Sequence, residues 1–495
     1  LIRIIVVVYE DGIVWRGEHR RLRRDLLVSK TYEEWKLAAA RLDEFMKHND
    51  WKEGDDTQHL YDAALLRKTT RKLSYSRRVN DCDKLLRHLM HACKHNHAGC
   101  ENEGLYSNTY LGSKVDVHRF YDEVELAIKH VIESPVISVE SKMTFFKSAS
   151  DIYGKTGLAL SGGGGMTYYH LGLLKVLFEQ DLMPMVISGS SGGSLMAALI
   201  CTRTNEEIVE DGVFTPEVMG HVLTIAADPW DVRIKRFFKD GFLFHPAVPF
   251  QKLEVMTKGH LTFREAHEKT GRVLCITVVP DEANTHKPAK VLNYITAPDV
   301  IISSAICASC ALPGLLPSGV LLCKTPSGKF APYQDVNTRW RDGSIRHDIP
   351  DLTSLGVTFT IASQVNFHIT PFFFDAQGSC GAPAAHRGGR GWRGGFALST
   401  LNQLLMLDLK KWLALCRDMR LLPPINATDM SSIFLQKVQF EGNVTVLPAK
   451  RNVLLDLPFV LEDPGVEGLR AYITQGEQKM WPKLLMSEHR LRIEK

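Results

Sequence analysis

Two short apolar segments each run directly into a glycine-rich turn and then into a helical pattern, and this repeat limits the possible folds more than any other feature. The first segment, 157–161, is followed by four glycines and a helical stretch at 168–180. The second begins at Pro184 and passes through a glycine-rich turn at 189–193 into another helix. Consecutive strand-turn-helix units are typical of a parallel sheet, which gathers such turns at the carboxyl ends of its strands, where ligands bind. The sequence therefore predicts an α/β fold with a site at that edge.

The second turn matches GxSxG, a motif that lifts a serine out of a sharp strand-to-helix turn. Ser191 is therefore the predicted nucleophile. The elbow glycines are Gly189, Gly192 and Gly193, and glycine suits a turn in which a Cβ atom has no room. The helix after Ser191 directs free N–H groups and the positive end of its dipole toward it. A glycine-rich turn without chemistry is the alternative.

The first turn supplies backbone N–H groups beside the serine. Its glycines are Gly162, Gly163, Gly164 and Gly165. Such amides stabilise an oxyanion that forms on a carbonyl attacked by Ser191. Two rival motifs do not fit: GxGxxG has no valid frame here, and a phosphate loop would need glycine where Ala149 stands.

A candidate acid lies far downstream, in Asp342-Gly343-Ser344. The order SGGGG, GSSGG and DGS resembles the patatin-like phospholipase family. That resemblance implies a three-layer α/β/α sandwich with a mainly parallel sheet and a Ser-Asp dyad without histidine. Ser191 would be the nucleophile, Asp342 its base, and the turn at 162–165 the oxyanion hole. The chain departs from many patatins at Met166-Thr167, where they carry a basic residue and a further glycine.

Further segments resemble a narrower group, the triacylglycerol lipases of yeast and plant seeds. These segments are Thr31 to Trp35, Leu292 to Asp299, Ser363 to Asn366 and Trp481 to Leu484. The resemblance implies release of fatty acids from neutral storage lipid, through an acyl-enzyme and without a cofactor. It also implies a cytoplasmic protein that is peripheral or anchored at a lipid droplet or the endoplasmic reticulum membrane.

Three alternatives stay open on the sequence. The first is a phospholipase A or lysophospholipase of the same fold, because every ester presents the same carbonyl to the same dyad. The second is a Ser-Asp-His triad, with His347 or His368 as the base. The third is a catalytically decayed scaffold that binds lipid surfaces.

Composition narrows the class of protein. A formal net charge of +4 on 495 residues is small and argues neither for a nucleic-acid partner nor for a strongly acidic one, and no nucleic-acid partner is expected. Ten cysteines without a framework spacing favour reduced thiols in the cytosol. The CxxC at Cys307 and Cys310 lies in an apolar run, which favours buried thiols over redox chemistry. Histidines in 88–100 are expected on the polar side of a helix, and no metal site is expected.

The chain length predicts more than one domain. The expected division is a hydrophobic and basic membrane-proximal segment at 1–30, a helical domain at 31–153, the catalytic domain at 154–366, and a linker with a mainly helical extension at 367–495. The apolar run 1–9 is interpreted either as the tail of a lost hydrophobic segment or as a buried strand. A helix at 396–422 is expected to pack on the core, with a lipid surface as the alternative.

Overall fold

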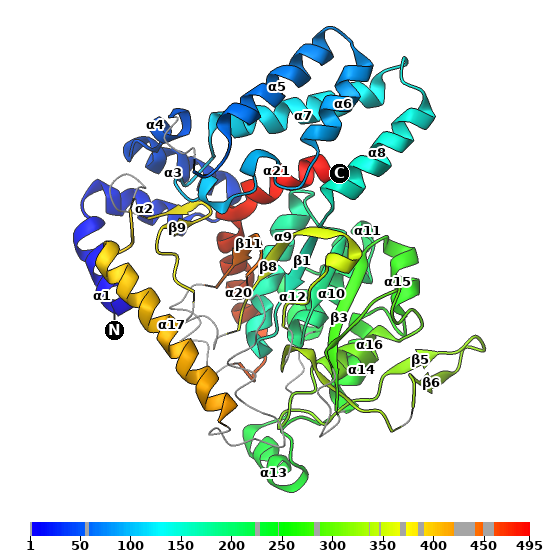
Figure 1. Ribbon diagram of the computed structural model, residues 1–495. Helices are drawn as coiled ribbons and strands as arrows, with labels where there is room; N and C mark the ends of the chain where they lie inside the picture. Colours follow the sequence, from blue (N-terminus) through cyan, green and yellow to red (C-terminus); the bar gives the residue numbers. More distant parts are fainter. Residues whose placement is uncertain are drawn as a thin grey trace.

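The computed structural model comprises one central sheet with helices around it. The N-terminal helices form a separate helical region, drawn in blue and cyan above the sheet (Figure 1). It describes residues 2–54, 59–222, 228–245, 247–281, 288–335, 337–345, 348–366, 373–384, 391–419, 441–448 and 460–495. Within these ranges, no helix combines the length and the apolar character that crossing a bilayer requires.

The described part of the sheet has seven strands in the order β11-β8-β1-β2-β3-β4, with β7 also paired to β3. Their bounds are β1 Lys155–Leu160, β2 Val186–Gly189, β3 Val273–Pro280, β4 Lys290–Leu292, β7 Trp340–Asp342, β8 Val357–Ser363 and β11 Val444–Val446. The first five strands of this order pair in parallel, whereas β4 and β7 run antiparallel to β3. The predicted α/β class with a mainly parallel sheet is confirmed.

The central strands are buried because they are apolar on both sides, as in sheets covered by helices on both faces. The apolar, β-branched runs 272–279 and 357–363 in the sequence predict two of these strands. Strand β8 has the bounds of the second run, and β3 begins and ends one residue after the first. Strand β11 comes from the C-terminal stretch and pairs with β8, so that stretch contributes to the sheet as well as to its helical cover.

Helices α9 (Tyr169–Glu179) and α20 (Gly465–Met480) cross at backbone contact. A Cβ atom at Gly172 would collide with the carbonyl of Ile473, and one at Gly476 with the carbonyl of Tyr169. Glycine on both helices therefore permits this close crossing. Through this crossing, the C-terminal part of the chain packs closely against α9, the helix that follows β1.

The N-terminal region is helical, as predicted for 31–153. Its longer helices are α2 Glu18–Val28, α3 Tyr32–Phe45, α5 Ala63–Arg78, α6 Cys82–Ala92, α7 Val115–Glu133 and α8 Val139–Tyr153. Thr31 caps α3, because its hydroxyl accepts a hydrogen bond from the Glu34 amide. In α6, Leu85 and Leu89 are buried while His91 is exposed, which matches the predicted amphipathic arrangement.

The first residues form helix α1 (Ile2–Tyr9), so the buried-strand interpretation of this run is wrong. A β-branched run favours a strand only when a sheet edge is available to pair with it. Here the run lies beside α17 (Phe396–Asp418) instead, with Val6 buried against Gly394 (Figure 1).

Helix α17 is far more exposed than the sequence predicts. Leu404, Leu407 and Trp412 are 58%, 62% and 54% exposed, so the expected packing of this helix on the core is wrong for much of its surface. The aromatic helix α13 (Trp230–Asp240) is similar, with Phe238 83% exposed. The amphipathic spacing predicted a helix at 396–422. It did not identify which surface covers the apolar face of that helix.

Candidate active site

Ser191 lies between β2 and α10 (Gly192–Cys201), in the backbone conformation of a strained turn. Its φ of 50° and ψ of −130° fall in a region that residues with a side chain rarely adopt. Glycines permit the turn, because a Cβ at Gly189 would collide with the Gly193 carbonyl and one at Gly193 with the Leu160 carbonyl. The elbow therefore packs directly against the end of β1.

Two neighbouring elements hold the backbone of Ser191. Its N–H donates to the Ser309 hydroxyl at 2.9 Å, and that hydroxyl donates to the Thr277 carbonyl of β3 at 2.8 Å. The Ser194 hydroxyl, one turn into α10, donates to the Ser191 carbonyl at 2.6 Å. The backbone N–H and carbonyl of Ser191 are thus both hydrogen-bonded locally, and the Ser191 side chain stays partly exposed.

Asp342 ends β7 and is only 1% exposed. Strand β7 runs antiparallel to β3, with Asp342 opposite Val278, and Gly343 follows where a Cβ would collide with the Thr277 carbonyl. Burial raises the pKa of Asp342 to about 6, while hydrogen bonds from Ser344 and from the Ser191 hydroxyl lower it. The structure therefore brings the predicted serine and the predicted acid into contact, although 151 positions separate them in the sequence.

The glycine turn lies against the same serine. A Cβ at Gly162 would stand 3.0 Å from the Cβ of Ser191. The Gly162 N–H donates to Asp348 at 2.8 Å, and the Gly165 N–H donates to the Val460 carbonyl at 2.6 Å. Among the described residues, no acceptor faces the N–H groups of Gly163 and Gly164. Of the four predicted oxyanion donors, Gly163 and Gly164 are therefore the two whose amides have no acceptor among the described residues.

Asp348 is a site residue that the sequence reasoning did not single out. It is 1% exposed, and burial raises its pKa to about 7, with Asp342 adding to the rise. Its carboxylate accepts hydrogen bonds from Gly162, Gln364 and Asn366. The only sequence signal was an acid in a loop shortly after Asp342, because the contact with Gly162 spans 186 positions.

One described histidine lies near the ends of these strands. Burial lowers the pKa of His170 to about 4, so its imidazole is neutral at pH 7. Its ring nitrogens contact the Ser161 carbonyl at 2.9 Å and the Ser363 hydroxyl at 2.7 Å. No imidazole of the described ranges hydrogen-bonds Ser191, and the two triad candidates, His347 and His368, lie outside those ranges.

Known proteins resemble this chain along its whole length. The family model described as patatin-like phospholipase matches residues 158–351, and one described as a domain of unknown function, DUF3336, matches 12–151. Triacylglycerol lipase ptl2 of Schizosaccharomyces pombe is 40% identical over all of this chain and 77% of its own length. The chain belongs to the patatin-like phospholipase family.

Fungal members of the family are similar along the whole chain. A patatin-like phospholipase domain-containing protein of Chaetomium globosum is 42% identical over all of this chain and 58% of its own length. One of Neosartorya fischeri is 38% identical and covered over 70% of its length. The chain thus spans about three fifths of the length of the first of these relatives. VipD of Legionella pneumophila matches at 15% identity with a TM-score of 0.25, over 44% of this chain and 53% of that one.

The departure from many patatins at Met166 and Thr167 has a local explanation. Both side chains are buried under the glycine turn. A Cβ at Gly192 would collide with the Thr167 hydroxyl, which has no hydrogen-bond partner in the described structure. A long basic side chain at Met166 would have to place its charge in this apolar space, and burial of an unpaired charge is costly.

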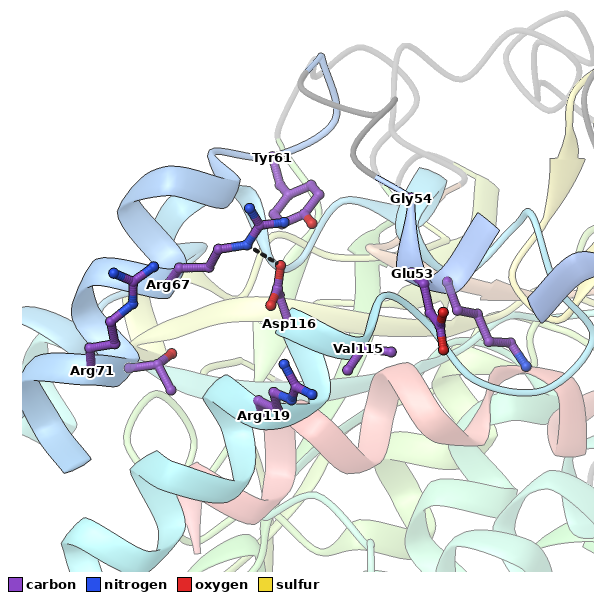
Figure 2. A pocket seen from close by; sticks show the side chains of 10 residues that line it. Glu53, Gly54, Tyr61, Arg67, Arg71, Val115, Asp116 and Arg119 are labelled. Carbon is purple, nitrogen blue, oxygen red and sulfur yellow. Dashed lines mark hydrogen bonds and ion pairs between the residues drawn. The ribbon is translucent and has the colours of Figure 1, made fainter. Parts of the chain in front are cut away.

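Two cavities of several hundred Å³ in the described part of the chain lie away from Ser191. One, of about 430 Å³, is in the N-terminal helical region, where Arg67 pairs with Asp116 and Arg71 and Arg119 flank the pair (Figure 2). The other, of about 510 Å³, lies beside α1 and the C-terminal helices. Neither is lined by the predicted dyad. No cluster of metal-ligating side chains occurs in the part of the chain that the structure describes.

Proposed function

We propose that this protein is a serine hydrolase of lipid esters that releases fatty acids from triacylglycerol by a Ser191-Asp342 dyad. The observation that carries the proposal is the position of the Ser191 hydroxyl beside the buried Asp342 carboxyl, close enough to lower the pKa of that acid. The acid has a pKa near the working range because it is buried, and a base works best when its pKa lies near the operating pH. An aspartate can then act as the general base for the serine, a role usually filled by a histidine imidazole.

The reaction takes place in two halves. As the Ser191 oxygen attacks the ester carbonyl carbon, its proton passes to Asp342 and the carbonyl oxygen becomes an oxyanion. The intermediate collapses, the alcohol leaves with the proton from Asp342, and the acyl group stays on Ser191. Water then attacks the acyl-enzyme with Asp342 again as base, which frees the fatty acid.

The oxyanion would be held by the amides of Gly163 and Gly164. Support comes from the absence of an acceptor for them among the described residues and from the close approach of the glycine turn to Ser191. Removing one such donor typically lowers kcat by about 10²- to 10³-fold. The N-terminus of α10 adds the favourable end of its dipole at the same place.

Triacylglycerol is the preferred substrate in this proposal because a relative 40% identical over the whole chain is named a triacylglycerol lipase. A phospholipase A or lysophospholipase is the second candidate, since the matching family model is described as a phospholipase. Product analysis on a mixed emulsion of triolein and phosphatidylcholine separates them. Fatty acid and diacylglycerol are expected as the main early products, and a predominance of lysophospholipid would favour the second candidate.

Exposed apolar helices support action at a lipid surface. Leu404, Leu407 and Trp412 on α17 and Phe238 on α13 present large apolar side chains to the outside. Such amphipathic helices bind at the interface between lipid and water. The protein is therefore proposed to bind a lipid droplet or membrane surface peripherally.

The test compares fatty-acid release from triolein by the wild type and by Ser191→Ala. The dyad account predicts release by the wild type and near-background release by the variant. Ser327→Ala, on an exposed turn, serves as a matched control and should keep full activity. Equal, near-background release from the wild type and Ser191→Ala would instead favour the scaffold alternative.

A further inference from the structure

Asp348 joins three parts of the site that are distant in the sequence. Its Oδ1 accepts the Gly162 N–H at 2.8 Å, and its Oδ2 accepts the Gln364 and Asn366 side-chain amides at 3.1 and 2.6 Å. Its carbonyl accepts the hydroxyl of Ser190, the residue before the nucleophile, at 2.7 Å. One residue therefore contacts the glycine turn, the elbow and the segment after β8.

We propose that Asp348 is a positioning residue that holds the glycine turn so that the Gly163 and Gly164 amides face the oxyanion. The inference rests on the proposed function. The turn is fixed at both ends, at Gly162 by the Asp348 carboxylate and at Gly165 by the Val460 carbonyl. Because peptide units are planar, fixing the two outer amides limits the directions that the two amides between them can take.

The contacts require an acceptor at this position. Three N–H groups converge on the carboxyl of Asp348, and an ionised carboxylate is an acceptor only. An asparagine has nearly the same shape but turns one NH₂ group toward one of these donors. Gly162 or the pair Gln364 and Asn366 would then face a donor, and a buried N–H without an acceptor forces the turn to move.

Asp348 does not compete with Asp342 for the role of base. The Ser191 hydroxyl interacts with Asp342 and lowers its pKa, whereas the side-chain oxygens of Asp348 accept hydrogen bonds from the three amides. Burial and, to a smaller extent, the charge of Asp342 disfavour ionisation of Asp348, and the hydrogen bonds from the amides favour it. The two buried carboxyls thus have separate tasks, one on the nucleophile and one on the glycine turn.

The test measures how strongly the enzyme prefers an oxygen ester to its thiono analogue. The substrates are p-nitrophenyl butyrate and the same ester with sulfur in place of the carbonyl oxygen. Amides arranged for an oxyanion discriminate against the larger and more weakly hydrogen-bonding sulfur. In Asp348→Asn we expect the ratio of the two kcat/KM values to fall at least about tenfold. We also expect kcat for the oxygen ester to fall by about 10- to 100-fold, less than for complete loss of a donor, with KM unchanged within about twofold.

Asp351→Asn is the matched control, because among the described residues its exposed carboxylate accepts only the local Thr353 amide. That variant should keep the wild-type ratio. Partial unfolding lowers the hydrolysis rates of the oxygen ester and the thiono ester in the same proportion and leaves their ratio unchanged. An unchanged ratio in Asp348→Asn would therefore overturn the positioning role even if activity fell. If Asp348→Asn does not fold by circular dichroism, Asn366→Ala replaces it. This variant removes one donor to the same carboxylate and should lower the ratio in the same direction, and an unchanged ratio there overturns the proposal equally.

The outcome also separates this inference from the proposed function. A wild type that hydrolyses neither ester, like Ser191→Ala, would overturn both. A wild type that hydrolyses the oxygen ester, with an Asp348→Asn ratio equal to that of the wild type, would overturn the positioning role alone.

Discussion

At the residue scale, the proposed nucleophile Ser191 has a strained backbone conformation that destabilises the folded state. A side chain held at the φ and ψ of Ser191 costs on the order of 1 to 3 kcal/mol, which the surrounding contacts must offset. Glycine adopts this conformation without that cost, although it loses more entropy on folding.

Ser191→Gly is therefore expected to be more stable than Ser191→Ala by about 1 kcal/mol, with both variants inactive. Both substitutions remove the hydroxyl, and only the first removes the Cβ. Urea denaturation of the two variants measures the difference. Equal midpoints would mean that the elbow is not strained in solution.

A second prediction at this scale concerns pH. The pKa of Asp342 is raised to about 6, and only its ionised form accepts the serine proton. Activity should therefore be present above this pKa and decline by about tenfold for each pH unit below it. Because Asp348, with a pKa of about 7, interacts with Asp342, the apparent pKa of the profile should lie between about 6 and 7.

The measurement is kcat/KM for a soluble short-chain ester from pH 4.5 to 8.5. Mutation of His347 and His368 to alanine should leave the profile in place. A flat profile, or one that disappears in the double histidine variant, would contradict the assignment of Asp342 as the base.

At the scale of single elements, α17 is expected to bind lipid. The variant Leu404→Glu/Leu407→Glu places two charges on side chains that are 58% and 62% exposed. Charged side chains resist transfer into an apolar layer, so binding to triolein emulsion should weaken several-fold while hydrolysis of a soluble ester is unchanged. Flotation of the protein with the emulsion measures the binding.

Val136→Glu, a comparable change at a 70% exposed valine in the N-terminal region, is the control and should bind as the wild type does. Equal flotation of the α17 variant and the wild type would show that this helix is covered by something other than lipid.

The sequence predicted those elements whose patterns are local. The strand after Gly356 is an apolar run bounded by a glycine, and its predicted limits agree with β8. The buried-strand interpretation of the run that forms α1 was wrong, and so was the expected core packing for much of α17, because a pattern of apolar residues does not identify the surface that covers them. Asp348 was missed for a related reason, since its partner Gly162 is distant in the chain.

At the scale of the whole molecule, one buried arginine joins the N-terminal helices to the sheet. Arg490 of α21 (Leu484–Glu494) donates to Glu101 at 2.9 Å, to the Tyr153 and Gly154 carbonyls, and to the Thr358 hydroxyl of β8. Its guanidinium also stacks over the Tyr153 ring at 3.7 Å. These contacts connect the C-terminal helix, the loops of the N-terminal region and the sheet.

Arg490→Ala should therefore destabilise the protein by about 3 to 5 kcal/mol, because the buried Glu101 carboxylate loses its guanidinium partner and keeps only the exposed His95 among the described residues. Arg470→Ala, which removes exposed ion pairs with Glu217 and Glu467, should change stability by less than about 1 kcal/mol. The midpoint of urea denaturation measures both changes. A similar small effect of the two variants would mean that the regions are not held together through Arg490.

The most direct test of the proposed dyad compares fatty-acid release from triolein by Asp342→Asn and by the double variant His347→Ala/His368→Ala. The account predicts that Asp342→Asn loses activity by at least about 10³-fold, since the serine has no base, while the double variant stays within about threefold of the wild type. Loss of most activity in the double histidine variant, or substantial activity in Asp342→Asn, would contradict a Ser-Asp dyad.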